Sequence, residues 1–370
     1  IHKYKLYFTP HKVNEVTTRR YDNLKNTGYV EPYQDSFLYI NGDGTLLNLK
    51  FDNNLLKGNY LNTNLLEIIK DHNFYSLSTI GVKDMRIFDD KIYITYLKNF
   101  PEKADDNDCY NLAVLESELI NKKDLSSIKT NVNFNIIFEF NDKCTSVLAN
   151  NTNQNGGRLE KINNEFFITV GDFRIPTISQ NDESNFGKII KFKKNLKNKF
   201  EIISKGHRNA QGLFYDKDKN YLLSTEHGPY GGDELNLIDL PLSGVVKNFG
   251  WDISSYGEHY DGDKNLPKLK KSHKNFGFSE PIMSFTPSIA IQDIKKIELD
   301  NDDFYVLSSL GKVSEEGDLS LHFFEINKKK YIPIDVVIIN QRIRDLAYDK
   351  FKKKLILVLE NPTAIAVIDL

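Results

Sequence analysis

The chain has 370 residues, of which 40% are hydrophobic and 12% aromatic, so it can bury a large core and is rich in the side chains that pack well in β-strands. Charged residues make up 27%, yet the formal net charge is only -2, and no block of like charge is long enough to indicate a nucleic-acid-binding arm. A nucleic-acid partner is therefore not expected. No run of about 18 apolar residues occurs either, so no membrane-spanning helix is expected in the given chain.

One pattern recurs along the chain, a short polar turn followed by an apolar strand that is often rich in Tyr or Phe. Six segments show it: 37–40, 92–96, 166–170, 221–225, 304–307 and 355–359. Several of them follow an upstream strand across a polar turn, which is a hairpin signal. A β unit that repeats at this interval predicts an all-β fold, a six-bladed β-propeller with four-stranded antiparallel blades that spans residues 1–370 as a single domain. A generic β-sandwich or a pair of unrelated β domains is the alternative.

Helical periodicity is scarce, and the two best short candidates are residues 61–71 and 115–122. The polar, glycine-containing segment 254–278 interrupts the repeat and is predicted to be a surface loop insertion. Long loops on a rigid scaffold are commonly either functional or disordered.

The chain has two cysteines, Cys109 and Cys144, and each lies beside a strand-like segment. Adjacent antiparallel strands could bring them together, and a disulfide would then close a loop of about 35 residues, worth roughly 3–4 kcal/mol of stability. A disulfide would favour an exported protein. Two buried thiols, as in a cytosolic protein, are the alternative.

Polar motifs fall at the ends of the recurring strands, where a propeller brings its blades together around a central channel. They are Gly156-Gly157-Arg158, Gly171-Asp172, Arg208-Asn209-x-Gln211, the turn 228–234, Gly311-Lys312 and Arg342-Ile343-Arg344-Asp345. The cations in this set outnumber Asp172 and Asp233, and arginine binds carboxylates in a bidentate manner, so a small ligand with carboxylates is predicted. The turn 228–234 offers carbonyl and carboxylate oxygens, which suit Ca²⁺.

Each motif also has a simpler explanation. Arg342 and Arg344 alternate along a strand and face one side of it, so salt bridges between blades could account for either. Residues 231–234 could be no more than a tight turn. His207 and His227 are expected to be hydrogen-bonded structural residues rather than metal ligands.

The motifs resemble, in order, those of a known family. HRNAQG at 207–212, STEHGPYGGDELNLI at 224–238 and NFGWD at 248–252 carry the likeness, together with GGRL at 156–159, TVGD at 169–172, PSIA at 287–290 and RIRD at 342–345. This set resembles the soluble aldose (glucose/sorbosone) dehydrogenases, six-bladed propellers that use pyrroloquinoline quinone (PQQ) and Ca²⁺ to oxidise sugars at the anomeric carbon. The likeness covers most of the chain after about residue 78, and the N-terminal blade matches weakly.

The resemblance implies a role for each matching residue. Arg208, Asn209 and Gln211 would hold the quinone, and Arg342 and Arg344 would pair with its carboxylates. The carbonyls of Gly228 and Pro229 would bind the Ca²⁺ that polarises the quinone, and Asp233 would lie beside the substrate. Lys312 is a looser match for a further quinone-binding residue, because it is displaced by one position from the lysine of the family.

One departure from the family bears directly on catalysis. The family has a histidine two residues before Gly-Gly-Arg that takes the proton from the anomeric hydroxyl, and here that position is Gln154. A carboxamide has no useful basicity near neutral pH, whereas a positioned general base typically contributes about 10²–10⁴-fold. The aspartate that would orient the histidine is retained as Asp172. An upstream glutamine of the family's quinone site is also missing from residues 76–81, SLSTIG.

Three functions follow from these residues. The first is a PQQ- and Ca²⁺-dependent dehydrogenase of a small-molecule sugar in which Asp172, directly or through a water, replaces the family histidine. The second is a non-catalytic propeller that binds a sugar or an acidic ligand, since Gln154 replaces the base. The third is a Ca²⁺-dependent lactone hydrolase, which leaves the arginines unexplained. A periplasmic or secreted location is expected, and the electron acceptor is not indicated.

Overall fold

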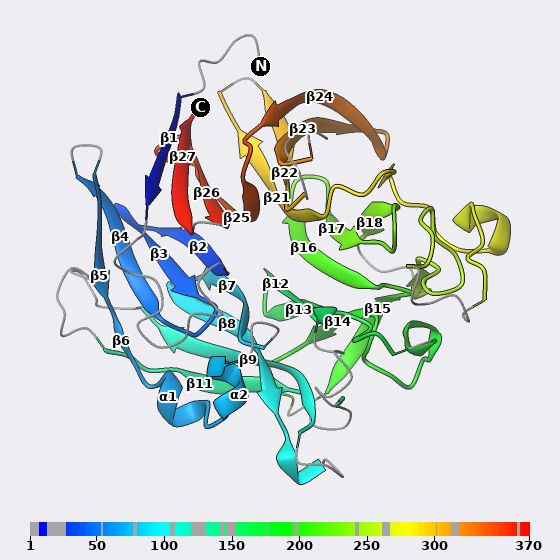
Figure 1. The fold of residues 1–370 in the computed structure, drawn as a ribbon, viewed down its shortest axis with the longest axis horizontal. Coiled ribbons are helices and arrows are strands. Elements are labelled where there is room, and N and C mark those ends of the chain that lie inside the picture. The colour runs from blue at the N-terminus through cyan, green and yellow to red at the C-terminus, as the bar shows by residue number, and fades with distance from the viewer. Residues whose placement is uncertain are drawn as a thin grey trace.

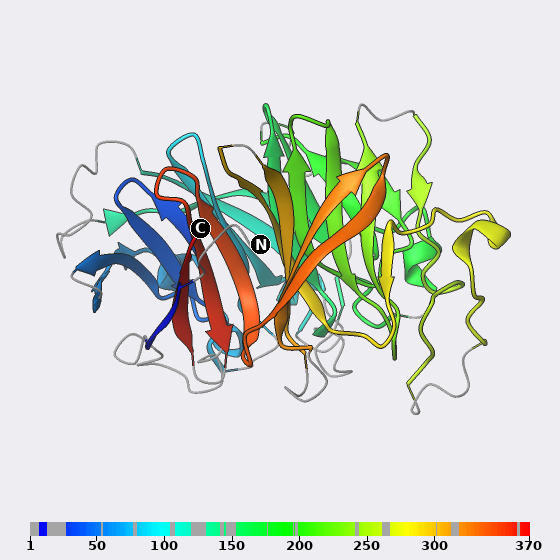
Figure 2. The same cartoon turned by 90° about the horizontal axis from the view of Figure 1, so that it is seen from above.

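The computed structural model describes residues 7–12, 27–52, 55–76, 80–103, 108–119, 131–140, 144–145, 153–175, 177–194, 196, 199–240, 244–260, 267–300, 302–311, 318–360 and 363–370. These residues form six antiparallel sheets that follow one another around a ring (Figure 1). Figure 2 shows the same sheets edge-on, side by side along a flattened body. The predicted six-bladed β-propeller is therefore confirmed.

Each blade runs from an inner strand to an outer one. The first blade contains β2 (Gly28–Tyr33), β3 (Ser36–Asn41), β4 (Leu46–Asp52) and β5 (Leu55–Tyr60). The second contains β7 (Val82–Phe88), β8 (Lys91–Asn99), β9 (Tyr110–Glu118) and β11 (Asn135–Glu139). The third contains β12 (Gly156–Ile162), β13 (Glu165–Val170), β14 (Lys188–Phe192) and β15 (Phe200–Lys205), to which β19 (Lys247–Asn248) adds in parallel.

The fourth blade contains β16 (Asn209–Asp216), β17 (Tyr221–His227), β18 (Asp233–Asp239) and β20 (Met283–Phe285). The fifth contains β21 (Ile291–Glu298), β22 (Asp303–Ser309), β23 (Ser320–Asn327) and β24 (Lys330–Ile338). The sixth contains β25 (Arg342–Asp349), β26 (Lys354–Glu360), β27 (Ala364–Asp369) and β1 (Tyr7–Lys12). Because β1 pairs antiparallel with β27, the N-terminal strand completes the C-terminal blade. All six predicted segments lie in the second strand of a blade.

Large aromatic side chains fill the space between neighbouring blades. The ring of Tyr93 on β8 lies 5.1 Å from that of Phe166 on β13, which in turn stacks on Phe192 at 5.2 Å. Phe138 on β11 also stacks on Phe192, with the ring centroids 4.0 Å apart. Aromatic pairs of this kind add to the area they bury, so the aromatic richness of the sequence is used to join blades.

Short hairpin turns connect the strands. Asp89 and Asp90 join β7 to β8 with φ values of 50° and 56°, and Lys328 and Lys329 join β23 to β24 with 48° and 59°. Two consecutive residues with positive φ suit the right-handed twist of a two-residue hairpin. The polar residues that marked these turns in the sequence therefore have a conformational reason.

The inner strands carry a repeated irregularity. In five of the six, the register with the second strand shifts near the start of the inner strand. In three of these β-bulges the extra residue is a single long polar side chain, namely Lys83, Gln211 or Arg344. Bulges re-aim side chains and are frequent next to functional sites.

A buried ion cluster ties the inner strands together. The guanidinium of Arg158 on β12 donates to Asp84 Oδ1 on β7 at 3.1 Å and to Asp345 Oδ1 on β25 at 2.6 Å. It also donates to the carbonyls of Gln211 at 2.6 Å and Arg344 at 3.1 Å. The Arg158 side chain is only 4% exposed, so it holds four blades in register from inside the protein.

Helices are short in the described part of the chain. They are α1 (Leu65–Ile68) and α2 (His72–Ser76), with 3-10 segments at Pro101–Lys103, Ile178–Gln180 and His273–Phe276. The predicted helix over 61–71 is thus reduced to one turn, and the one over 115–122 is wrong, because residues up to Glu118 belong to β9. Two further short strands, β6 (Asn62–Thr63) and β10 (Asn131–Val132), pair in parallel. None of the described helices has the length and apolar character needed to cross a membrane.

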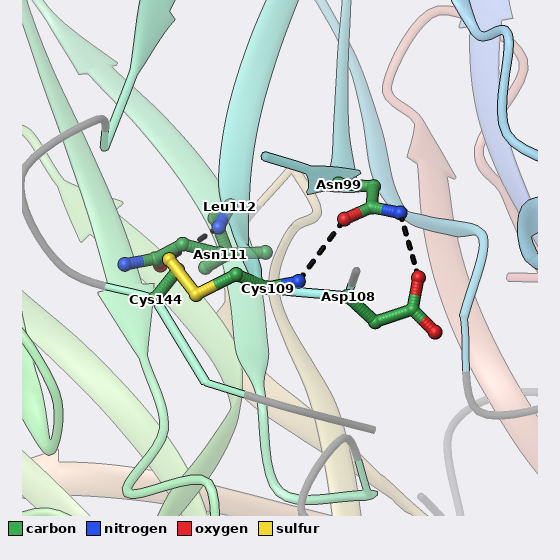
Figure 3. Close-up of a disulfide and its surroundings, with 6 residues drawn as sticks. All are labelled: Asn99, Asp108, Cys109, Asn111, Leu112 and Cys144. Carbon is green, nitrogen blue, oxygen red and sulfur yellow. Dashed lines mark hydrogen bonds between the residues drawn. A yellow bond between two sulfur atoms is a disulfide. The ribbon is translucent and has the colours of Figure 1, made fainter. Parts of the chain in front are cut away.

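The two cysteines form a disulfide, with a Cα–Cα distance of 5.1 Å across a sequence separation of 35 residues (Figure 3). Tyr110, next to Cys109, forms a β-bridge with Thr145, next to Cys144. The Cys109 amide also donates to Asn99 Oδ1 at 3.1 Å, which fixes the start of β9. The alternative of two separate thiols is excluded.

Replacing both cysteines with serine is expected to lower the free energy of unfolding by about 3–4 kcal/mol, because an open 35-residue loop gains conformational entropy in the unfolded chain. Urea unfolding of the two proteins without reductant measures the difference. Adding reductant should destabilise the parent protein and leave the serine variant unchanged. Equal midpoints for both proteins would contradict the prediction.

Candidate functional site at one end of the propeller

The predicted site residues gather where the inner strands begin and the second strands end. Asp172 follows β13, Gly228 follows β17 and Gly311 follows β22, while Arg342 begins β25. A cavity of about 670 Å³ opens at this end. Arg208, His227, Gly228, Asp233 and Gly311 contribute to its lining, together with residues 286–290 and Tyr260. The lining thus comes from the fourth and fifth blades, and hydrogen bonds connect it to the third blade through Gln154 and Arg208 and to the sixth through Arg342 and Gly311.

Gln154, at the position of the missing histidine, is bound on both sides. With its amide oriented to satisfy its neighbours, Nε2 donates to Asp172 Oδ1 at 2.9 Å. Its Oε1 accepts from Arg208 Nη2 at 2.8 Å and from Arg174 Nε at 3.1 Å. The Gln154 carbonyl lies so close to Gly171 that a Cβ there would approach it to 2.0 Å, so only glycine fits before Asp172. Gln154 thus links the carboxylate of Asp172 to the guanidinium groups of Arg208 and Arg174.

Asp172 is a buried carboxylate within a set of donors. Its Oδ1 also accepts from the Arg174 amide at 2.9 Å, and its Oδ2 accepts from Trp251 Nε1 at 2.7 Å. Burial raises the pKa of Asp172 to about 7, against the opposing effects of Arg208 and of these hydrogen bonds. The carboxylate can therefore exchange a proton near neutral pH.

Arg208 lies over the rings of Trp251 and Tyr260, at 5.4 and 5.8 Å from their centroids. Its Nη1 donates to the carbonyls of Gly228 at 2.6 Å and His227 at 3.2 Å. The Gly228 carbonyl, one of the two expected Ca²⁺ ligands, is thus already bound by a cation, and the Pro229 carbonyl faces Ser288 Oγ at 3.5 Å.

Two backbone carbonyls would give only part of a calcium site. Ca²⁺ takes six to eight oxygen ligands. The described residues contain no group of three or more His, Cys, Asp or Glu side chains that could hold a metal. The protein donor set in this conformation therefore does not fit Ca²⁺ alone, and the ion would need oxygens from a bound ligand and a shift of Arg208.

Asn209 and Gln211 begin a row of carboxamides. Gln211 Nε2 donates to Asn209 Oδ1 at 2.7 Å, and Gln211 Oε1 accepts from Gln292 Nε2 at 3.1 Å on the next blade. The buried Gln292 Oε1 has no hydrogen-bond partner among the described residues. An acceptor left unsatisfied at the end of this row indicates a place for a donor from a ligand.

Arg342 and Arg344 pair with one carboxylate of their own blade rather than with another blade. Glu360, at the end of β26, accepts from Arg342 Nε at 3.1 Å and from Arg344 Nε at 2.6 Å. Arg342 Nη1 also donates to the carbonyls of Leu310 and Gly311, at 3.0 and 2.8 Å. One glutamate cannot neutralise two arginines, so one positive charge is left for a ligand. Lys312 lies outside the described residues.

Three other predicted residues lie around the site, namely His207, His227 and Asp233. His207 is fully buried between Glu226 and Ser204, with both ring nitrogens at 2.8 Å from an oxygen, in accord with the structural role expected for it. His227 lines the cavity, and its buried Nε2 has no partner in the described structure. Asp233 is buried, and its two oxygens accept from the amides of Gly228 at 3.0 Å and Ile291 at 3.3 Å, which shape the turn.

Several residues of the site were missed from the sequence. Trp251 lies within a matching motif, but its bond to Asp172 is not evident from the sequence, and neither is the pairing of Glu360 with the two arginines. Lys83 shares its bulge position with Gln211 and Arg344, and burial together with Arg344 lowers the pKa of its amine to about 7. Only the register of the inner strands, which the sequence does not display, could have identified Lys83.

The chain was compared with known families and curated proteins. A family model described as Glucose / Sorbosone dehydrogenase matches residues 81–361. The aldose sugar dehydrogenase YliI of Escherichia coli is 32% identical over 152 residues, which cover 38% of this chain and 39% of that protein. An uncharacterized Synechocystis protein, slr1608, is 29% identical over 215 residues, covering 52% and 50%. The chain thus spans half or less of the length of the curated relatives it matches.

Solved structures agree with the fold over nearly the whole chain. The apo-form of the soluble aldose sugar dehydrogenase from Escherichia coli has a TM-score of 0.71 at 19% identity and covers 98% of this chain and 99% of its own. The PQQ-bound form of the aldose sugar dehydrogenase from Streptomyces coelicolor has a TM-score of 0.62 at 17% identity, covering 99% and 98%. The fold is therefore the propeller of the sugar dehydrogenases. With the family model matching well over half of its length, the chain belongs to the glucose/sorbosone dehydrogenase family.

Proposed function

We propose that the protein is a quinoprotein oxidoreductase that oxidises an aldose at the anomeric carbon, with PQQ as cofactor and with Ca²⁺. The observation that carries the proposal is a set of three arginines, Arg208, Arg342 and Arg344, at the same end of the propeller as the buried carboxylate Asp172. Guanidinium groups in excess of their partners suit a cofactor with several carboxylates. The donor set therefore fits PQQ.

Each part of the site has a defined task in this proposal. Arg342 and Arg344 would bind carboxylates of the cofactor with the donors that Glu360 does not use, and Asn209 and Gln211 would hold its polar edge. Gly228 and Pro229 would add carbonyl oxygens to Ca²⁺, with the remaining oxygens coming from the ligand. When bound, PQQ supplies an acceptor for the hydride that leaves the anomeric carbon. Asp233 would keep the turn in shape beside the sugar.

The proton of the anomeric hydroxyl needs a separate acceptor. Asp172 is the carboxylate that contacts Gln154, and its raised pKa matches the task of a general base near neutral pH. Both oxygens of Asp172 already accept hydrogen bonds. We propose that the proton of the anomeric hydroxyl reaches Asp172 either directly or through one water. This is the step in which the chain would differ from its family.

The proposal is tested by cofactor binding first and turnover second. PQQ is titrated into the protein with and without Ca²⁺, and its absorbance spectrum reports binding. Reduction of an artificial dye is then assayed over a panel of aldoses. Saturable binding and sugar-dependent dye reduction are expected, and no turnover with any aldose despite bound PQQ would exclude the dehydrogenase.

The rate is expected to depend on the ionisation of Asp172. Since burial raises its pKa to about 7, the fraction of carboxylate, and with it kcat/KM, should rise as the pH increases through about 7. Trp251→Phe removes a hydrogen bond that favours the carboxylate, so the rising limb should move to higher pH. A pH–rate profile of both proteins checks this, and a profile that is flat between pH 5 and 9 would contradict it.

A second function has its own support. Gln154 is a carboxamide without basicity, and its partner Asp172 already accepts hydrogen bonds at both oxygens, so the pocket could bind a sugar or an acidic ligand and not turn it over. Binding of PQQ or of a sugar without dye reduction would identify this case.

The disulfide supports a periplasmic or secreted location.

A further inference from the structure

Three blades place a long polar side chain at the same level of their inner strands. The inner strands β7, β16 and β25 lie around the centre of the ring (Figure 1), and each has a bulge near its start. The extra residues are Lys83, Gln211 and Arg344, each the second or third residue of its strand. The inner strands begin at the end of the propeller that carries the candidate site. Lys83 therefore has the position in the second blade that Gln211 and Arg344 have in theirs.

The residue after each of the two cations is an aspartate that joins the blades. Asp84 follows Lys83 and Asp345 follows Arg344, and the two carboxylates bind Arg158 Nη1 at 3.1 and 2.6 Å. The aspartate of each pair thus belongs to the buried ion cluster, which holds the blades in register. The cation of each pair lies at the bulge, outside the regular ladder, where a side chain can be directed towards a ligand.

The Lys83 side chain lies in buried surroundings, next to another cation. Its stem packs on the third blade at Gly157, where an added Cβ would come within 2.5 Å of the Lys83 Cβ. Burial and the charge of Arg344 lower the pKa of the Lys83 amine to about 7. Glu360 already pairs with both Arg342 and Arg344, so it cannot balance a third cation as well. An apolar side chain would avoid the repulsion, and a lysine at this place therefore indicates an anionic ligand.

The second blade is also the one in which the quinone site of the family is incomplete. Residues 76–81, which precede β7, lack the glutamine expected from the resemblance. We propose that Lys83 is a further binding residue, which holds a carboxylate of the ligand together with Arg344. An ammonium group and a guanidinium group both form charge-assisted hydrogen bonds to carboxylates. The identity of the ligand as PQQ rests on the function proposed above, whereas the carboxylate site at Lys83 does not.

Two tricarboxylates test the site by binding alone. PQQ carries three carboxylates and a quinone, whereas trimesate is a benzene ring with three carboxylates and cannot act as a redox cofactor. Each is titrated calorimetrically into the protein, with and without Ca²⁺. Lys83→Met should weaken the binding of at least one of them by roughly ten- to a hundredfold, as expected for the loss of one hydrogen bond between charged groups. Lys83→Arg, which keeps the charge, should retain most of the affinity.

Further variants separate a binding role from a structural one. Lys83→Gln removes the charge and keeps a polar group, and it should lose affinity as Lys83→Met does. Urea unfolding of both variants should show no loss of stability, because a buried cation next to Arg344 is removed. Lys161→Met is the matched control, since it removes a lysine of another inner strand, β12, which pairs with Asp89 at the far end of that strand. It should leave both affinities unchanged.

Three results would overturn the carboxylate site at Lys83. They are unchanged affinity for both probes in Lys83→Met, an equal loss of affinity in Lys161→Met, and failure of both probes to bind the parent protein. A loss of stability at unchanged affinity would show that Lys83 is structural instead. A protein that binds trimesate through Lys83 but never binds PQQ would contradict the proposed function alone. PQQ-dependent turnover with affinities that Lys83→Met does not change would contradict the Lys83 site alone.

Discussion

Gln154→His is expected to raise kcat for aldose oxidation by about 10²–10⁴-fold, the usual contribution of a positioned general base. Gln154 Nε2 is 2.9 Å from Asp172 Oδ1, so an imidazole at this position can donate one N–H to the carboxylate and turn its other nitrogen towards the cavity. Asp172 would then orient the base and stabilise its charged form. Dye reduction by the PQQ-loaded proteins, measured under saturating sugar, gives the ratio.

Two further variants make the result specific. Gln154→Asn keeps a carboxamide and should show no gain, and adding Asp172→Asn to Gln154→His should remove most of the gain. An inert parent protein that becomes active as Gln154→His would favour the non-catalytic function for the natural chain. A parent that is already as fast as the histidine variant would show that Gln154 does not limit the reaction.

Arg158→Met is expected to lower the free energy of unfolding by about 3–5 kcal/mol, because it leaves two buried carboxylates without their cation. Asp84 and Asp345 are 1% and 3% exposed, and both lie within 3.1 Å of the Arg158 guanidinium. The methionine has the apolar bulk of the arginine stem without its charge. Urea unfolding at pH 7 measures the loss, and Lys353→Met, which removes an exposed pair with Asp300, should cost less than about 1 kcal/mol.

The loss should also depend on pH. Burial raises the pKa of Asp345 to about 7 even beside Arg158, so the folded protein keeps a proton that the unfolded chain releases near its ordinary pKa of 3.8. Stability therefore falls as the pH rises through this window. Without Arg158 the carboxylate form is disfavoured further, so the destabilisation should be smaller at pH 5 than at pH 7. A loss that is equal at both values would exclude the buried carboxylates as its cause.

The fold could be predicted because the second strand of each blade is buried on both faces. Residues such as those of β13 and β26 therefore form continuous apolar runs, and the polar turns beside them mark the hairpins. The closing strand β1 could not be predicted. Its partner β27 is some 350 residues away along the chain, and a strand that adds to the edge of a distant blade has no local signal.

The sequence predicts which residues belong to the site, but not which of their side chains pair with one another. Arg208, Arg342 and Asp172 were found because each follows or precedes a recognisable strand. Glu360 was missed as the partner of two arginines because it ends a strand whose interior, residues 355–359, is entirely apolar. The prediction of a helix over 115–122 is wrong because β9 is an interior strand, flanked by β8 and β11. Since β9 is buried on both faces, its sequence does not alternate between apolar and polar residues as a half-buried strand does.

The bulges of the inner strands have a consequence for how this protein can change. A residue in the regular ladder is constrained by the strand beside it, whereas the extra residue of a bulge can be exchanged with little effect on the pairing around it. Lys83, Gln211 and Arg344 occupy such positions on three different blades. The propeller thus offers three positions outside the regular ladder at one end of the ring, each with a long polar side chain. New specificity can evolve there by single substitutions while the scaffold stays the same.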